Sequence, residues 1–157
     1  MAAMRLALYQ PDIPQNTGTI MRLAACMNVP VDVIGPPGFD LSDRALKRAA
    51  LDYLPYVDLT RHVSWEEFLE KRASTEGIGR LVLLSARGDH PYTEFRFARD
   101  DTLLLGRETA GVPDSVRAVA DASVRIPMRS DLRSLNIAVA AAMVLGEALR
   151  QTGLFPS

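Results

Sequence analysis

Three polar turns in this sequence contain the residues that could carry out chemistry. The first turn contains Asn16 and leads to Arg22, the second is the glycine-rich stretch LGRETAGVP (105–113), and the third contains Ser134 and Asn136. The second follows a short apolar run, and the third opens a long apolar helix. Turns after strands and helix N-termini present free backbone N–H groups. Brought side by side, these turns would form a concave site for a nucleoside-like ligand.

Several common catalytic and binding signatures are absent from the sequence. It contains no G-x-G-x-x-G after the first expected strand, no G-x-x-x-x-G-K-[ST] and no G-x-S-x-G nucleophile turn. His62 and His90 have no convincing partners for a catalytic triad. Cys26 is the single cysteine, so the sequence shows no Cys/His pattern for a metal site and no internal disulfide. A reducing, cytoplasmic setting fits, and the first residues show no signal peptide.

The length, composition and net charge of the chain indicate which class of protein it belongs to. It has 157 residues, of which 48% are hydrophobic and 24% charged, with a net charge of −1. These values are typical of a single globular domain, 1–157, with its own core. The balanced charge gives no overall basic footprint of the kind expected for a small nucleic-acid-binding domain. Any contact with RNA would therefore use local basic patches or a surface built by two subunits.

Short apolar runs alternate with helical patterns along the chain. This alternation predicts an α/β fold with a mainly parallel sheet flanked by helices. In the helix after the first strand, Ile20, Leu23, Ala24 and Met27 form one apolar stripe, and Arg22 points away from it. Strands are expected at 5–9, 31–34, 57–59, 81–84, 103–105 and 124–126, and helices at 17–28, 42–51, after a Ser64–Glu67 capping box, and at 135–150.

The last expected helix is apolar on nearly all sides. Only Asn136 and Glu147 interrupt its apolar residues before its end, and many of these residues are small. A helix of this kind must be buried on most of its surface, and a second subunit is a natural candidate for part of that burial. We therefore expect a homodimer through this helix, with a charged residue at Ala141 splitting the dimer or unfolding the chain.

Two further segments are notable, one for its clustered charge and one for its length without a regular pattern. Arg44, Lys47 and Arg48 lie on one face of the expected helix 42–51, which makes them the densest positive cluster in the first half of the chain. The stretch 87–101 has no clear period, and loops this long in a compact domain tend to be functional or mobile.

The three turns belong to longer motifs in a fixed order. These are PxIPQNTGxIxRLA (11–24), LGRETAGVP (105–113) and RIPMxSxxRSLNxAxAxAxxLxEALRQ (125–151). Each motif alone is weak, but their order and this chain length together resemble the SPOUT class of RNA methyltransferases. Within that class, the sequence is most similar to the TrmL-type enzymes, which methylate the wobble ribose of tRNA. The resemblance covers nearly the whole chain.

This resemblance implies a fold, a cofactor and a reaction. The fold would be the α/β fold above with a C-terminal trefoil knot, in a homodimer that has the last helix in its interface. S-adenosylmethionine would be bound by Leu84, Gly106, Ile126 and Ser134. Its methyl group would pass to the ribose 2′-OH of C34 or a modified U34, and no metal would be needed.

The resemblance also assigns roles to single residues. Arg22 would orient the nucleophile and a neighbouring phosphate, since arginine is almost always protonated and is a poor general base. Asn16 would order its loop. Glu108, Ser134 and Asn136 are further candidates for shaping the site. Phosphates of tRNA would contact Arg44, Lys47, Arg48, Arg129 and Arg133, in addition to Arg125.

Two alternative functions remain open at the level of sequence. One is a SPOUT 2′-O-methyltransferase that acts on another tRNA position or on ribosomal RNA. The other is a non-catalytic α/β module that binds a nucleoside or RNA.

Overall fold

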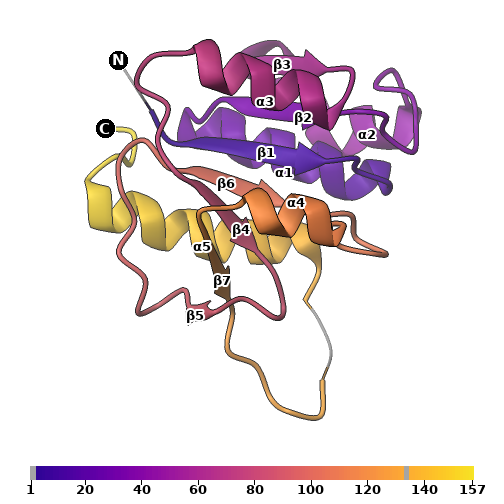
Figure 1. The fold of residues 1–157 in the computed structure, drawn as a ribbon. Helices are drawn as coiled ribbons and strands as arrows, with labels where there is room; N and C mark the ends of the chain where they lie inside the picture. The colour runs from indigo at the N-terminus through magenta and orange to yellow at the C-terminus, as the bar shows by residue number, and fades with distance from the viewer. Residues whose placement is uncertain (1–2, 133–134) are drawn as a thin grey trace.

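The structure is built on one parallel β-sheet of seven strands. The computed structural model describes residues 3–132 and 135–157. The strand order is β3-β2-β1-β6-β4-β7-β5, and all six strand pairings are parallel (Figure 1). The strands are β1 (Arg5–Tyr9), β2 (Val31–Ile34), β3 (Leu59–His62), β4 (Leu81–Leu84), β5 (His90–Pro91), β6 (Thr102–Leu105) and β7 (Ala122–Arg125). The predicted mainly parallel α/β fold is therefore confirmed.

Helices cover both faces of this sheet. They are α1 (Pro14–Met27), α2 (Arg44–Ala50), the 3₁₀ helix η1 (Leu51–Tyr56), α3 (Trp65–Ser74), α4 (Asp114–Val119) and α5 (Ile137–Thr152). Helices α1, α2 and α5 pack in the larger core with alternate strand residues such as Leu6 and Leu103. Helices α3 and α4 pack in the smaller core on the other face, with Ala7 and Leu104. This division arises because successive side chains along a strand point to opposite faces of the sheet.

The helix boundaries differ from the prediction where capping chemistry decides them. Helix α1 begins at Pro14, three residues earlier than predicted, because proline is well suited to the first helical turn. Asp43 caps α2 by accepting from the backbone N–H groups of Ala45 and Leu46, which shortens the predicted helix. Ser64 caps α3 as predicted, by accepting from Glu67 N at 3.1 Å.

The predicted strand at 57–59 lies instead at Leu59–His62. Its register is set by pairing with β2, since Val31 lies opposite Leu59 and Ile34 opposite His62. The preceding residues form η1, which begins with Leu51 in a left-handed conformation (φ 55°). A non-glycine residue rarely adopts this conformation, and the sequence pattern gave no sign of it.

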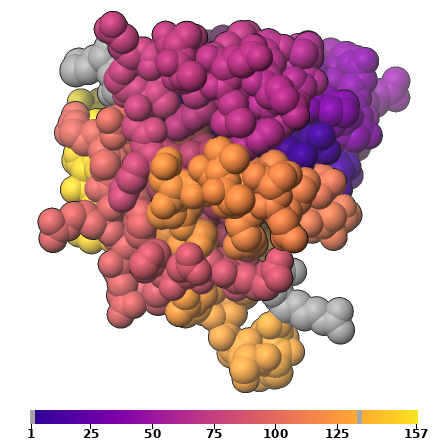
Figure 2. Space-filling view, in the orientation of Figure 1, coloured from indigo at the N-terminus to yellow at the C-terminus, as the bar shows by residue number. Residues whose placement is uncertain are grey.

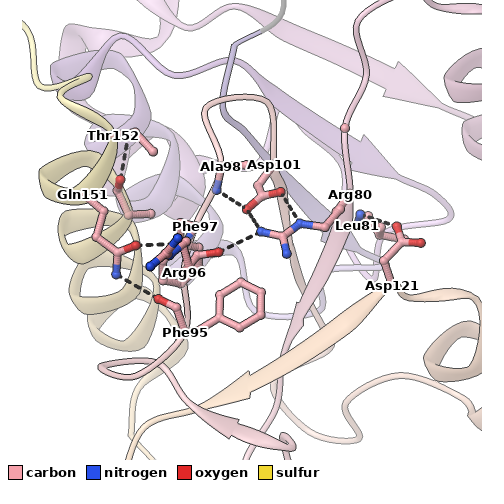
Figure 3. Close-up of polar contacts among 12 residues, drawn as sticks. Arg80, Leu81, Phe95, Arg96, Phe97, Ala98, Asp101, Asp121, Gln151 and Thr152 are labelled. Carbon is pink, nitrogen blue, oxygen red and sulfur yellow. Dashed lines mark hydrogen bonds and ion pairs between the residues drawn. The ribbon is translucent and has the colours of Figure 1, made fainter.

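Polar contacts hold the long stretch between β4 and β6 against the body (Figure 3). The guanidinium of Arg80 donates to both carboxylate oxygens of the fully buried Asp101, at 2.8 and 3.0 Å, and to the carbonyl of Arg96. The hydrogen bonds to Asp101 raise the pKa of Arg80. From α5, Gln151 accepts from Phe97 N and donates to Phe95 O, both at 2.9 Å. The later part of this stretch is therefore anchored at two points.

Helix α5 buries one side in its own chain and exposes the other. Ala141 is 1% exposed and lies in the larger core, whereas Val139 is 50% and Met143 39% exposed. Ala142 is also exposed. Ala141 is therefore a residue of the chain's own core, and of the two outcomes predicted for a charged residue there, its burial favours unfolding of the chain.

The loop that follows β7 projects from the body of the molecule (Figure 2). Met128 and Leu132 in this loop are exposed. The trefoil knot stays a prediction from the resemblance. Among the described residues, no helix is both long and apolar enough for a bilayer crossing.

Candidate active site

A cavity of about 530 Å³ opens where β4 and β6 end and where α1 and α5 begin. Because these strands are parallel, their carboxyl ends meet at one edge of the sheet, the usual position of ligand sites in open α/β folds. The cavity volume lies in the range of small-molecule sites. Its walls include Ile13, Asn16, Leu84, Ser85, Gly106, Glu108, Arg117, Ile126, Asn136 and Ala140.

The structure brings most of the predicted cofactor residues together. Leu84, Gly106 and Ile126 all line this cavity, although they come from three separate segments of the chain: Leu84 ends β4, Gly106 lies in the second motif and Ile126 in the third. Ser134 lies outside the described residues. Leu84 and Ile126 give apolar walls, which leaves recognition of polar groups to backbone atoms and to other side chains.

Two asparagines join the first and third motifs at the cavity. The side-chain amide of Asn136 donates from Nδ2 to Oδ1 of Asn16 at 2.9 Å. The Oδ1 atom of Asn136 also caps α5 by accepting from Ala138 N and Val139 N. Asn16, predicted to order its loop, thus holds the start of α1 against the start of α5, and both side chains line the cavity.

Gly106 serves the turn of the second motif. A Cβ atom at this position would lie 2.8 Å from the carbonyl carbon of Gly111, too close for any side chain. Two backbone hydrogen bonds between Arg107 and Gly111 close the turn, and Gly111 has a φ of 62°. The close contact that requires glycine at position 106 is therefore a contact within the chain, with the backbone of Gly111.

A pair of carboxyl groups, which no sequence pattern had paired, links the first and second motifs. Asp12 N donates to Glu108 Oε2, and Glu108 N donates to Asp12 Oδ1, both at 3.2 Å. Burial raises the pKa of Glu108 to about 7, and its hydrogen bond with the Asp12 side chain adds to this rise. The hydrogen bond to Glu108 in turn lowers the pKa of Asp12. Glu108 is thus a cavity carboxyl group that titrates near neutral pH.

This pair predicts a pH-dependent stability. The unfolded Glu108 ionises near its ordinary pKa of 4.5, but the folded one keeps its proton up to about pH 7. Its stabilising contribution is therefore complete below 4.5 and is lost as the pH rises through 7. Glu108→Gln keeps a neutral donor and acceptor, so we expect its melting temperature to fall less than that of the wild type between pH 5.5 and 8. Discounted for partial exposure, the difference should be about 1 kcal/mol, or roughly 2–4 °C.

Thermal melts of both proteins at the two pH values would measure this difference. The opposite contribution of Asp12 is lost only as the pH falls, below the tested range, because its folded pKa lies below 3.8. Parallel curves for the wild type and Glu108→Gln would contradict the raised pKa of Glu108.

Arginines also line the cavity. Arg117, from α4, donates to Ser85 Oγ at 2.7 Å. Arg107 donates from Nε to Gly111 O at 3.0 Å, and its guanidinium lies 5.5 Å from the centre of the Tyr9 ring. Arg87 completes this set. Neither Arg107 nor Arg117 has a local sequence pattern that separates it from a solvated arginine, so neither was predicted as a cavity residue.

Arg22 does not line the cavity of its own chain. Its side chain is exposed, and its guanidinium lies 5.1 Å from the centre of the Tyr53 ring. The predicted RNA contacts Arg44, Lys47 and Arg48 are exposed on α2, also away from the cavity. Arg129 forms an exposed ion pair with Asp131 at 2.8 Å, and Arg133 lies outside the described residues. Among the described residues, no cluster of three potential metal ligands occurs.

Relatives of known name match nearly the whole chain. It is 60% identical over 148 residues to the tRNA (cytidine(34)-2′-O)-methyltransferase of Beijerinckia indica subsp. indica, with 94% of this chain and 91% of that protein covered. It is 38% identical over 152 residues to the protein of the same name from Escherichia coli strain K12, with 96% and 94% covered.

Solved structures match as well. A structure that concerns the 2′-OH methylation of C/U34 on tRNA has a TM-score of 0.88 at 46% identity and covers 96% of both chains. The SpoU methyltransferase AviRb from Streptomyces viridochromogenes, in complex with the cofactor AdoMet, has a TM-score of 0.86 at 32% identity, with 95% of this chain and 60% of that chain covered. Residues 3–146 match the model of the SpoU rRNA Methylase family. The SPOUT resemblance is confirmed, and this chain belongs to the SpoU methylase family.

Proposed function

We propose that this protein transfers a methyl group from S-adenosylmethionine to the ribose 2′-OH of nucleotide 34 of tRNA, either C34 or a modified U34. The observation that carries the proposal is the single cavity that all three motifs build at the carboxyl edge of the sheet. Relatives named as tRNA (cytidine(34)-2′-O)-methyltransferases support the choice of substrate. We further propose that residues 1–157 form one catalytic domain that acts in the cytoplasm, where its tRNA substrates are found.

The cavity fits S-adenosylmethionine in both size and chemistry. Leu84, Ile126 and Ala140 would provide apolar walls for a base, and residues of the turns after β4 and β6 line the same cavity. When bound, this cofactor supplies an electrophilic methyl group on a sulfonium. Ser134 stays a proposed fourth contact, in line with the resemblance.

The side chains of this chain would position the ribose and manage its proton. A hydroxyl group becomes a good nucleophile only when its proton is lost or shared. Glu108 is the cavity carboxyl group whose pKa is raised to about 7, so we assign it the role of holding this proton. Asn16 and Asn136 would keep the cavity wall in place. Arg22 would orient the RNA from outside this cavity.

The exposed side of α5 supports a homodimer. Val139 and Met143 lie one turn apart on this side, and Ala142 lies between them. Exposed apolar side chains in neighbouring positions on a helix are typical of an interaction surface. A two-fold symmetric contact would pair this surface with its own copy and bring two sets of basic residues together for tRNA.

Methyl transfer to bulk tRNA tests the proposal directly. The tRNA is isolated from cells that lack this protein, incubated with labelled S-adenosylmethionine and the wild-type protein, and digested to map the labelled nucleotide. We expect label on the ribose of nucleotide 34. Label at another tRNA position, or on ribosomal RNA alone, would replace the proposed substrate. Cofactor binding without label on any RNA would favour a non-catalytic binding module.

A further inference from the structure

The 3₁₀ helix η1 exposes an aromatic side chain that the fold does not use. Tyr56 is 77% exposed, and Leu51 at the other end of η1 is 50% exposed. Neither takes part in the two hydrophobic cores. A large aromatic ring that contributes no packing is available to stack on a planar ligand.

Basic residues lie on the elements that adjoin η1. The guanidinium of Arg22 lies 5.1 Å from the centre of the Tyr53 ring, within the range of a cation–π contact. This contact fixes the position of Arg22 and leaves its N–H groups free to bind a phosphate. Lys47 and Arg48 lie in the last turn of α2, immediately before η1. Asp52, also exposed, is the single acidic residue within η1.

Close helix packing joins this surface to the cavity. At Gly18 of α1, a Cβ atom would lie 2.3 Å from the carbonyl oxygen of Leu46 in α2, so only glycine permits this approach. Helix α1 also packs against η1. Asn16 lines the cavity, and Arg22 lies six residues further along the same helix, a rise of roughly 9 Å. The surface is therefore held at a fixed, short distance from the cavity.

We propose that η1 is a stacking surface for an unpaired RNA base that adjoins the methylated nucleotide. The ring of Tyr56 stacks on the base, while Arg22, positioned by Tyr53, binds a backbone phosphate. Stacking on aromatic rings beside a positive groove is the general mode of binding for single-stranded RNA. The inference rests on the proposed function, because it assigns the surface to the same RNA substrate.

Binding of a stem–loop RNA with an unpaired loop tests this inference. The probe is a transcript of an anticodon arm, and its dissociation constant is measured for the wild type, Tyr56→Ala and Tyr56→Phe. We expect Tyr56→Ala to weaken binding by about tenfold or more and Tyr56→Phe to bind within about twofold of the wild type, since phenylalanine keeps the ring. As a control, Phe155→Ala removes a different exposed aromatic ring, near the C-terminus. This variant should bind as the wild type does.

Salt dependence separates stacking from charge. Tyr56→Ala should keep the wild-type slope of log affinity against log salt, whereas Lys47→Ala should reduce it by about one phosphate contact. Wild-type affinity in Tyr56→Ala, or a changed oligomer mass in place of changed affinity, would overturn the stacking role alone. Failure of the wild type to methylate any tRNA would overturn the proposed function and this inference with it.

Discussion

Arg22→Ala should lower the rate of methyl transfer to tRNA by about 100-fold or more and leave binding of S-adenosylmethionine unchanged. Small errors in the placement of reacting groups cost this much in rate, and Arg22 is assigned to placing the RNA. Cofactor binding should persist because Arg22 does not line the cavity of its own chain. Single-turnover kinetics and cofactor titration of the same preparation would measure the two quantities.

Two control variants show whether the effect belongs to this guanidinium. Arg61→Ala removes another exposed arginine, on β3, and should transfer methyl groups at the wild-type rate. Arg22→Lys keeps the charge but loses the planar fork, so we expect an intermediate rate. Normal turnover in Arg22→Ala would exclude the role assigned to this residue, and loss of cofactor binding would place the residue at the cofactor site instead.

Aspartate at two adjacent positions of α5 should have opposite consequences. Ala141 is 1% exposed within its own chain, so Ala141→Asp would bury an unpaired carboxylate and should cost roughly 3–5 kcal/mol of folding free energy. That loss is a large part of the stability of an ordinary domain. Ala142 is exposed, so Ala142→Asp should fold normally and weaken only the proposed dimer.

Denaturant unfolding and solution mass distinguish these outcomes. We expect Ala141→Asp to lose its cooperative unfolding transition or to move it to much lower denaturant. Ala142→Asp should keep the transition of a folded chain and shift the mass toward that of a monomer. A folded Ala141→Asp protein would contradict the packing of α5, and an unchanged dimer mass in Ala142→Asp would contradict the proposed interface.

The sequence by itself determined most of the elements and three of the cavity's apolar and glycine positions, but it did not predict β5, η1 or α4. Short apolar runs such as Leu81–Leu84 are typical of buried strands, and the Ser64–Glu67 pattern located the start of α3. The three motifs lie at the ends of strands and at the start of a helix. Because the strands are parallel, their carboxyl ends meet at one edge of the sheet. Leu84, Gly106 and Ile126 were therefore predictable as neighbours, because the α/β topology leaves little freedom in where these turns meet.

Only the tertiary structure decided which side chains face one another. Asp12 and Glu108 are 96 positions apart, and their contact, which helps to raise the pKa of Glu108, depends on two loops that touch only after the sheet has formed. Ala141 and Ala142 are the same residue type in adjacent positions, yet packing against the strands buries one and exposes the other. Arg22 does not line the cavity, because the rotation of α1 against the sheet fixes the direction in which its side chain points. Helical periodicity gives relative directions around a helix, but the absolute direction comes from packing contacts that are distant in the sequence.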